Sequence, residues 1–227
     1  MNINGLAIMR FNNTETGEEI GVRIKHNTNT DYGKQLVLLK LNPNAVGSFT
    51  NPLPAAISTG VVPDKYRILL FALGSSGSAV ATDTAQTSLN KLVPLKLKSD
   101  ATADTSVYFK PFATDSALIQ ASNYSVHASA SKDDFYWKKI DSFSKESSNA
   151  IKYTLQITNA DVSSQDPSIT TLNIDEFGLY AVATDTDANG IVTINETLPK
   201  ILFARLSETY SKSNSIGISI EWIVGIL

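Results

Sequence analysis

Alternation of apolar and polar residues with a period of two is the feature that most limits how this 227-residue chain can fold. The period appears in the ranges 20–24, 151–157 and 216–224. It indicates β-strands that bury one face and expose the other. The apolar members are Ile20, Val22 and Ile24 in the first range, Ile151, Tyr153, Leu155 and Ile157 in the second, and Ile216, Ile218, Ile220, Trp222 and Val224 in the third.

Further strands are predicted from nearly continuous apolar runs, which are typical of strands covered on both faces. Three such runs occupy residues 36–41, 66–73 and 201–206. Residues 178–184 and 191–194 flank a polar turn that ends in Asn-Gly, a strong signal for a β-hairpin.

Helical periodicity is scarce, and short helices are predicted only at residues 84–93 and 115–122. Residues 42–63 are rich in proline and predict a long loop or an extended arm. The whole pattern predicts an all-β, β-sandwich-like domain with an extended N-terminal arm and at most one or two short helices. We separate strands and arm at 1–65 from the main β-sandwich at 66–227, and expect one structural unit.

The composition excludes several classes of protein. A chain without cysteine has no disulfide framework, no thiolate metal site and no cysteine nucleophile. A net charge of -3 gives no basic excess for binding nucleic acid. Residues 1–11 lack the pattern of a signal peptide, and no apolar run approaches the ~20 residues of a membrane span. We therefore expect a soluble protein that binds neither nucleic acid nor membrane and is not exported by the classical route.

Candidate catalytic residues are few. His26 and His127 are the two imidazoles of the chain, and His26 precedes a polar stretch as surface histidines commonly do. The nucleophile elbow G-x-S-x-G is absent, because the nearest match at residues 74–78 ends in serine. The glycine motifs that bind phosphate are absent too. We predict a non-enzymatic protein with no catalytic residue and no cofactor.

One metal-binding motif matches in full. Asp185, Asp187, Asn189 and Glu196 occupy ligand positions of D-x-[DN]-x-[DN]-G-x5-E, the calcium loop of an EF-hand. A predicted strand precedes the motif, and Pro199 falls where the exiting helix should run. We therefore interpret the segment as a β-hairpin whose turn uses Asp and Asn, and assign no metal ligand. A calcium site in a setting other than an EF-hand is the alternative.

An aromatic cluster lies within residues 132–140. Three consecutive aromatic residues flanked by lysines can stack on sugars or bases. On a strand, however, Phe135 and Trp137 share one face and Tyr136 takes the other. We favour a core strand with one exposed tyrosine.

Four segments, taken in order, resemble tail and fibre proteins of tailed bacteriophages. Residues 66–85 combine a strand, a Gly/Ser turn and an Ala-Thr-Asp-Thr-Ala ending, similar to a strand and "TDTAL"-like stretch of that group. Residues 174–180 are similar to its I-x-E-x-G-L-Y/F strand, and residues 201–206 to its LFAR return strand. Residues 218–223 are similar to its terminal β-strand. The resemblance spans residues 66–224.

This resemblance implies a non-enzymatic structural component of a tailed-phage virion, in the tail, baseplate, neck or fibre attachment. Such a protein assembles by β-strand pairing and packing into a symmetric complex. Its partners would be copies of itself and other phage structural proteins, and its location the virion, after synthesis in the host bacterial cytoplasm. The alternative is a carbohydrate- or receptor-binding β-sandwich module, with or without calcium at the EF-hand-like motif. A host glycan as partner has no support of its own in the residues.

Overall fold

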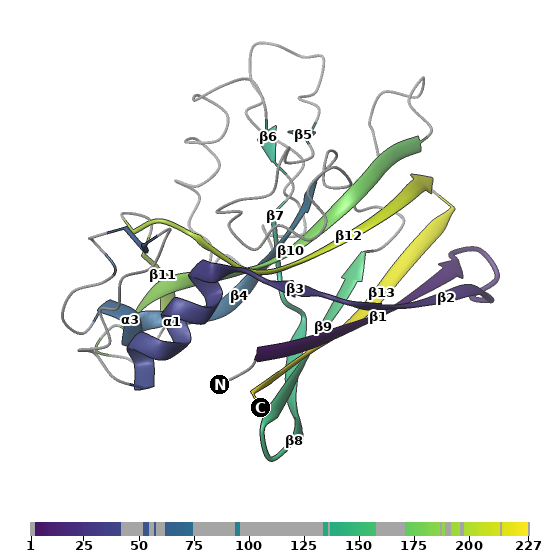
Figure 1. Cartoon of the computed structure of the whole chain (residues 1–227). Helices are drawn as coiled ribbons and strands as arrows, with labels where there is room; N and C mark the ends of the chain where they lie inside the picture. The colour runs from purple at the N-terminus through teal and green to yellow at the C-terminus, as the bar shows by residue number, and fades with distance from the viewer. Residues whose placement is uncertain are drawn as a thin grey trace, which may run out of the picture.

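The computed structural model describes residues 3–41, 52–54, 57, 62–74, 94–95, 134–135, 137–157, 171–186, 188, 192–195, 198–213 and 215–226. Within them the chain forms two large antiparallel sheets and two short helices, so the predicted all-β sandwich-like fold is confirmed. Figure 1 shows the two sheets lying one above the other, with both chain ends at the same side of the lower sheet.

The first sheet joins the two ends of the chain. Its strand order is β2-β1-β13-β9-β8, so the C-terminal strand lies at its centre. Ala7 pairs with Trp222, and Trp222 in turn pairs with Tyr153. The strands predicted at residues 151–157 and 216–224 are confirmed. The five strands are β1 (Ile3–Asn13), β2 (Glu19–His26), β8 (Ser142–Ser147), β9 (Ala150–Ile157) and β13 (Ile216–Ile226).

The second sheet has the strand order β3-β12-β10-β4-β7, and β11 pairs with β10. The strands predicted at residues 66–73 and 201–206 are confirmed. So is the predicted hairpin, because Asp185 on β10 stands opposite Thr193 on β11. The predicted helices at 84–93 and 115–122 lie outside the described residues. The strands are β3 (Thr28–Asn29), β4 (Tyr66–Gly74), β7 (Trp137–Lys139), β10 (Thr171–Thr186), β11 (Val192–Ile194) and β12 (Ile201–Ser213), and a separate pair is β5 (Pro94–Leu95) with β6 (Asp134–Phe135).

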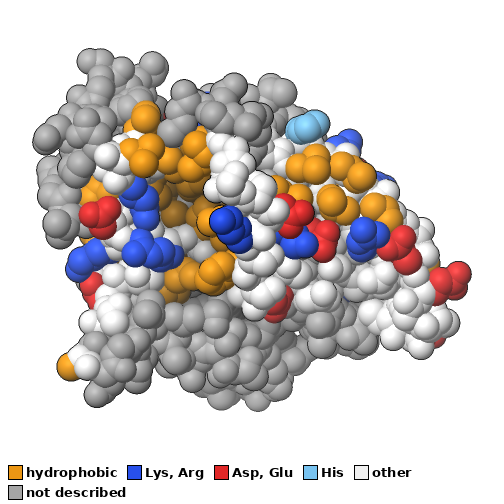
Figure 2. Space-filling model, turned by 90° about the horizontal axis from the view of Figure 1, so that it is seen from below, with side chains coloured by type: hydrophobic (Ala, Val, Ile, Leu, Met, Phe, Trp, Pro, Cys, Tyr) orange, Lys and Arg blue, Asp and Glu red, His pale blue; other side chains and the backbone are white. Residues whose placement is uncertain are grey.

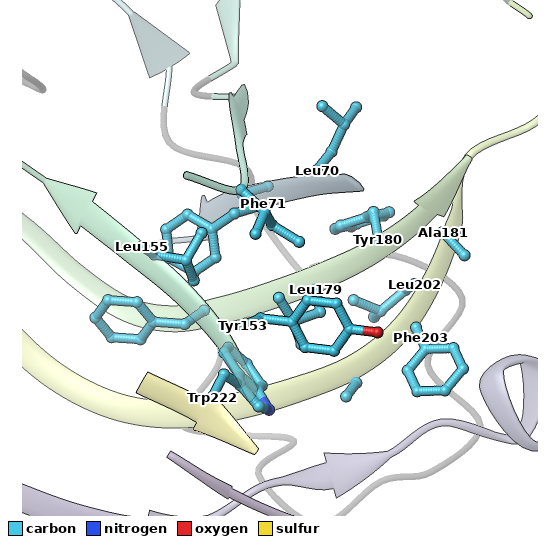
Figure 3. Close-up of a cluster of buried hydrophobic side chains, with 14 of the residues drawn as sticks. Leu70, Phe71, Tyr153, Leu155, Leu179, Tyr180, Ala181, Leu202, Phe203 and Trp222 are labelled. Atoms are coloured by element: carbon cyan, nitrogen blue, oxygen red, sulfur yellow. The ribbon is translucent and has the colours of Figure 1, made fainter. Parts of the chain in front are cut away.

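The core lies between the two sheets. Trp222 on β13 is fully buried, as are Leu155 on β9 and Leu179 on β10. The rings of Phe71 and Phe177 lie 6.1 Å apart, on neighbouring strands of the second sheet. Figure 3 shows side chains of both sheets in one cluster, with Trp222 and Leu155 from the first sheet and Phe71 and Leu179 from the second. The alternating pattern of β13 thus places its apolar side chains inside, as predicted.

The prediction of a strand at residues 36–41 is wrong, because these residues form the second half of helix α1 (Asp31–Leu41). Thr30 caps the helix: its Oγ1 accepts a hydrogen bond of 3.0 Å from the backbone N–H of Gly33. Leucine has a high helix propensity, and a short apolar run does not by itself distinguish a buried helix from a strand. The helix packs against β12, which explains why the run is apolar.

The strand predicted around residues 20–24 forms as β2, but its apolar side chains are not buried as predicted. Ile20, Val22 and Ile24 are 53%, 41% and 61% exposed. The pairing register explains this, because Met9 on β1 points into the core and stands opposite Arg23. The core-facing side of β2 is therefore its charged side, and Val22 and Ile24 face outward.

The proline-containing segment 42–63 is described in part. Leu53 and Ile57 are buried, and the backbone N–H of Leu53 donates a hydrogen bond of 3.0 Å to Oε1 of Gln35 on α1. A short helix, α3 (Val62–Lys65), then leads into β4. Leu53, Ile57 and Pro63 thus pack on the body of the molecule, whereas Pro52 is exposed. The other residues of the predicted arm, apart from Pro54 and Val62, lie outside the described part.

Trp222→Ala is expected to lower the free energy of unfolding by about 3–5 kcal/mol, because it empties a large site at the centre of the core. Urea unfolding followed by circular dichroism measures the change. The control Ser142→Ala, at an exposed position of β8, should stay within about 0.5 kcal/mol of the parent. An equally small loss for Trp222→Ala would show that the buried face has been assigned wrongly.

Gly33→Ala tests how closely α1 lies on β12. Helix propensity alone predicts a gain of about 1 kcal/mol from this change. A Cβ at Gly33 would lie 2.3 Å from the backbone oxygen of Phe203, so we expect a net loss of at least about 1 kcal/mol instead. Thermal or urea unfolding measures it. Gly21→Ala is the control, since its Cβ would meet only a ring carbon of Phe11 at 4.0 Å. Stabilisation by Gly33→Ala would contradict the close packing of α1 on β12.

Candidate functional site

The calcium-loop motif begins on a β-hairpin. The two oxygens of Asp185 both have protein partners: Lys65 Nζ lies 2.8 Å from Oδ1, and Asn195 Nδ2 donates to Oδ2 at 2.6 Å. The hydrogen bond from Lys65, with that from Asn195, holds the pKa of Asp185 below its ordinary value. Asp185 is thus part of a local polar contact that fastens the hairpin to α3. The remaining motif residues, Asp187, Asn189 and Glu196, lie outside the described residues.

The other residues singled out in the sequence are dispersed. His26 is exposed at the end of β2, where it lines a hollow of about 510 Å³ together with Asn27, Thr28 and Lys34. His127 lies outside the described part of the chain, as do the side chains of the aromatic cluster at residues 134–137. Among the described residues, no three His, Asp or Glu side chains are placed to hold a metal ion together. No described helix has the length and apolarity needed to cross a membrane.

A buried ion pair lies between β10 and β12. Arg205 Nη2 is 2.8 Å from Glu176 Oε1, and both side chains are fully buried. Gly178 stands directly opposite Arg205 in the sheet. Sequence reasoning did not foresee this pair, although Glu176 belongs to the I-x-E-x-G motif and Arg205 to the LFAR motif. A buried pair of this kind favours one strand register, because any other would leave a charge unpaired.

A second charged contact joins the two sheets. Glu208 on β12 accepts from Arg23, and Lys25 Nζ lies 3.0 Å from its other carboxylate oxygen. Burial acts to raise the pKa of Glu208, but the hydrogen bonds from Lys25 and Arg23 outweigh it and lower the pKa below its ordinary value. This contact holds β2 with its charged side toward the second sheet.

The exposed large apolar side chains of the described residues gather in two places. Three of them are on β2, and the other four surround a cleft at the opposite end of the first sheet. Figure 2 shows both: an apolar area next to the single coloured histidine, and a deep apolar hollow on the other side of the view. The residues are Ile20, Val22 and Ile24 on β2, and Leu41, Phe143, Ile151 and Ile226 around the cleft.

The apolar cleft has a volume of about 710 Å³ and opens between α1, the start of β4 and the β8–β9 hairpin. Lys40, Arg67 and Lys145 are among its lining residues. Lys40 Nζ donates to the backbone oxygen of Tyr66 at 2.6 Å, and burial, with the nearby Arg67, lowers the pKa of Lys40. Burial raises the pKa of two lining tyrosines, Tyr66 and Tyr153, to about 12. The cleft is therefore apolar within and bordered by cations.

The β1–β2 hairpin ends in an ordered acidic tip. Asn13 Oδ1 accepts from the backbone N–H groups of Glu15 at 2.8 Å and Thr16 at 3.2 Å. Gly17, with a φ of 73°, closes the turn by donating to the backbone oxygen of Asn13 at 2.8 Å. Glu15, Glu18 and the adjacent Glu19 are exposed. The tip thus presents carboxylates beside the aliphatic side chains of β2.

Glu208→Gln is expected to lower the free energy of unfolding by about 1–2 kcal/mol at pH 7, because it removes the acceptor charge for Arg23 and Lys25. Since the folded-state pKa of Glu208 lies below its ordinary value of 4.5, the carboxylate stabilises fully above pH 4.5. The difference in the free energy of unfolding between the parent and Glu208→Gln should shrink as the pH falls below 4.5. Urea unfolding from pH 7 to pH 3 measures it.

The matched control is Glu19→Gln, which loses a pair with Arg10 in which both side chains are nearly half exposed. That variant should stay within about 1 kcal/mol of the parent. A difference between Glu208→Gln and the parent that persists unchanged to pH 3 would contradict the assigned role of the carboxylate.

No family model, no curated protein and no solved structure matches this chain. The resemblance to tailed-phage proteins stays a prediction from the motifs. The described part of the chain exposes two apolar surfaces, one on the β1–β2 hairpin and the other in the apolar cleft.

Proposed function

We propose that the chain is a non-enzymatic structural component of a tailed-phage virion, which assembles by β-strand pairing and packing into a symmetric tail, baseplate, neck or fibre-attachment complex. The observation that carries this proposal is the gathering of the exposed large apolar side chains at β2 and at the apolar cleft. The assignment to a phage comes from the sequence motifs that follow one another along residues 66–224.

Leaving apolar surfaces of this kind in water costs free energy. Each buried Å² of apolar surface contributes roughly 25 cal/mol, so contiguous exposed patches are a mark of interaction sites. β2 is also an edge strand of the first sheet. Arg23 and Lys25 point inward on this edge, a device that limits open-ended strand pairing, so the outward aliphatic side chains of β2 are the part that favours packing against another chain. Both features suit a protein that functions by assembling.

The ordered contacts around these surfaces suit the same role. The carboxylate of Glu208 keeps β2 in place, and the ion pair of Glu176 with Arg205 favours one register in the second sheet. A surface held in place loses little conformational entropy when it binds, which favours stable association.

A second candidate is the carbohydrate- or receptor-binding module. The hollow beside His26 favours it, because its lining combines amide, hydroxyl and amino groups from Asn27, Thr28 and Lys34. Groups of these types hydrogen-bond to sugar hydroxyls. The apolar surfaces have no part in this candidate, so we place it second.

Mass spectrometry of gradient-purified phage particles from the source culture tests the proposal. We expect the chain at a fixed copy ratio to the major capsid protein, and light scattering of the isolated chain should show a mass above that of the 24.5 kDa monomer. Absence from intact particles would overturn the virion assignment. Binding to a glycan array that Asn27→Ala abolishes, by a chain that stays monomeric, would favour the second candidate.

A further inference from the structure

We infer that the β1–β2 hairpin of one copy docks into the apolar cleft of a second copy, so that copies of the chain join head to tail. The inference rests on the proposed function and specifies which surfaces meet. It concerns assembly of this chain with itself and needs no other protein.

Charge complementarity identifies the occupant of the cleft. The hairpin carries three exposed glutamates at its tip, and Glu15 and Glu18 have no ion-pair partner among the described residues. The cleft has Lys40, Arg67 and Lys145 among its lining residues, and none of the described lining residues is acidic. Asp64 lies close enough to oppose the lowering of the Lys40 pKa, but it does not line the cleft.

The apolar parts of the two surfaces match as well. Ile20, Val22 and Ile24 project from the hairpin beside its acidic tip. In the cleft, Phe143 and Ile151 are 69% and 42% exposed. If the aliphatic side chains of the hairpin entered this cleft, they and the apolar side chains of the cleft would both be removed from water. The glutamates of the tip would then meet the cations at the border of the cleft.

The two surfaces of one copy cannot meet each other. Ile3, at the start of β1, lines the cleft, whereas Asn13, at the end of β1, begins the hairpin tip. An extended strand of this length separates them by about 33 Å. β1 is held on both sides by β2 and β13, so it does not fold back. The contact must therefore form between copies.

Both surfaces also offer open backbone groups. The backbone N–H of Asn27 donates to the backbone oxygen of Gly5 on β1 at 3.1 Å. Residues of antiparallel strands alternate between facing their partner strand and facing away from it with their backbone groups. The N–H and C=O groups of Val22 and Ile24 therefore point away from β1. β8, which forms one wall of the cleft, is the other edge of the same sheet. Contacts between two different surfaces of this kind build rings or filaments rather than closed dimers.

Cysteine pairing tests the contact, because the chain has no cysteine of its own. Glu18→Cys and Lys145→Cys are prepared as two separate proteins, mixed and oxidised. We expect a disulfide-linked dimer containing one copy of each, identified by mass spectrometry of the linked peptides. Neither protein alone should form it. Ser142→Cys, on the opposite face of β8 from Lys145, is the matched control and should not link to Glu18→Cys.

Charge reversal gives a second measurement. Glu18→Lys and Lys145→Glu should each weaken self-association at least tenfold in sedimentation velocity, and a mixture of the two should recover part of it by pairing the exchanged charges. Both positions are exposed, so thermal unfolding should confirm that the variants fold like the parent. Equal association of the parent and both variants would overturn the inference.

The outcomes separate this inference from the proposed function. A homodimer linked by Glu18→Cys alone would show hairpin meeting hairpin, which overturns head-to-tail docking and keeps assembly. Oligomers in which Glu18→Cys and Lys145→Cys are not linked would also overturn head-to-tail docking and keep assembly. A chain that stays monomeric and gives no link would overturn the docking, and the particle measurement would then decide the virion assignment by itself.

Discussion

The pairing of β13 between β1 and β9 is the constraint on which the rest of the structure depends. The last strand of the chain lies at the centre of the first sheet and carries Trp222 into the core. The first strand has no inner neighbour until the last one is in place. The β1–β2 and β8–β9 hairpins are local, and the pairing of β13 between β1 and β9 joins them into one sheet. The apolar surface on β2 and the β8–β9 wall of the cleft both belong to that sheet.

Two charged contacts then favour the register of one strand pair and the orientation of one edge strand. Glu176 with Arg205 favours the register of β10 on β12, inside the second sheet. Glu208 binds Arg23 and Lys25 and so turns the charged side of β2 toward the second sheet. The aliphatic side of β2 faces outward as a result. The surface that supports the proposed assembly thus depends on the register of β2 on β1, and the carboxylate of Glu208 stabilises that arrangement.

Much of the fold could be predicted from local sequence patterns. Where that prediction failed, the cause can be identified. The strands β4, β9, β12 and β13 and the β10–β11 hairpin were predictable, because period-two alternation, long apolar runs and Asn-Gly turns are local signals. Helix α1 was missed because a short leucine-rich run fits a buried helix as well as a strand. Its cap at Thr30 was the available signal. The candidate surfaces were not predicted, since alternation reveals two faces without revealing which one is covered.

The sequence by itself determined the all-β class, the positions of β4, β9, β12 and β13 and which side of β13 is apolar, because these depend on residue type and spacing along the chain. Only the tertiary structure decided that β2 exposes its aliphatic side, that Glu176 meets Arg205, and that an apolar cleft bordered by cations opens at the far end of β1. These features arise where strands distant in the sequence meet. Burial there depends on which partner packs against each face, and a local pattern does not contain that partner.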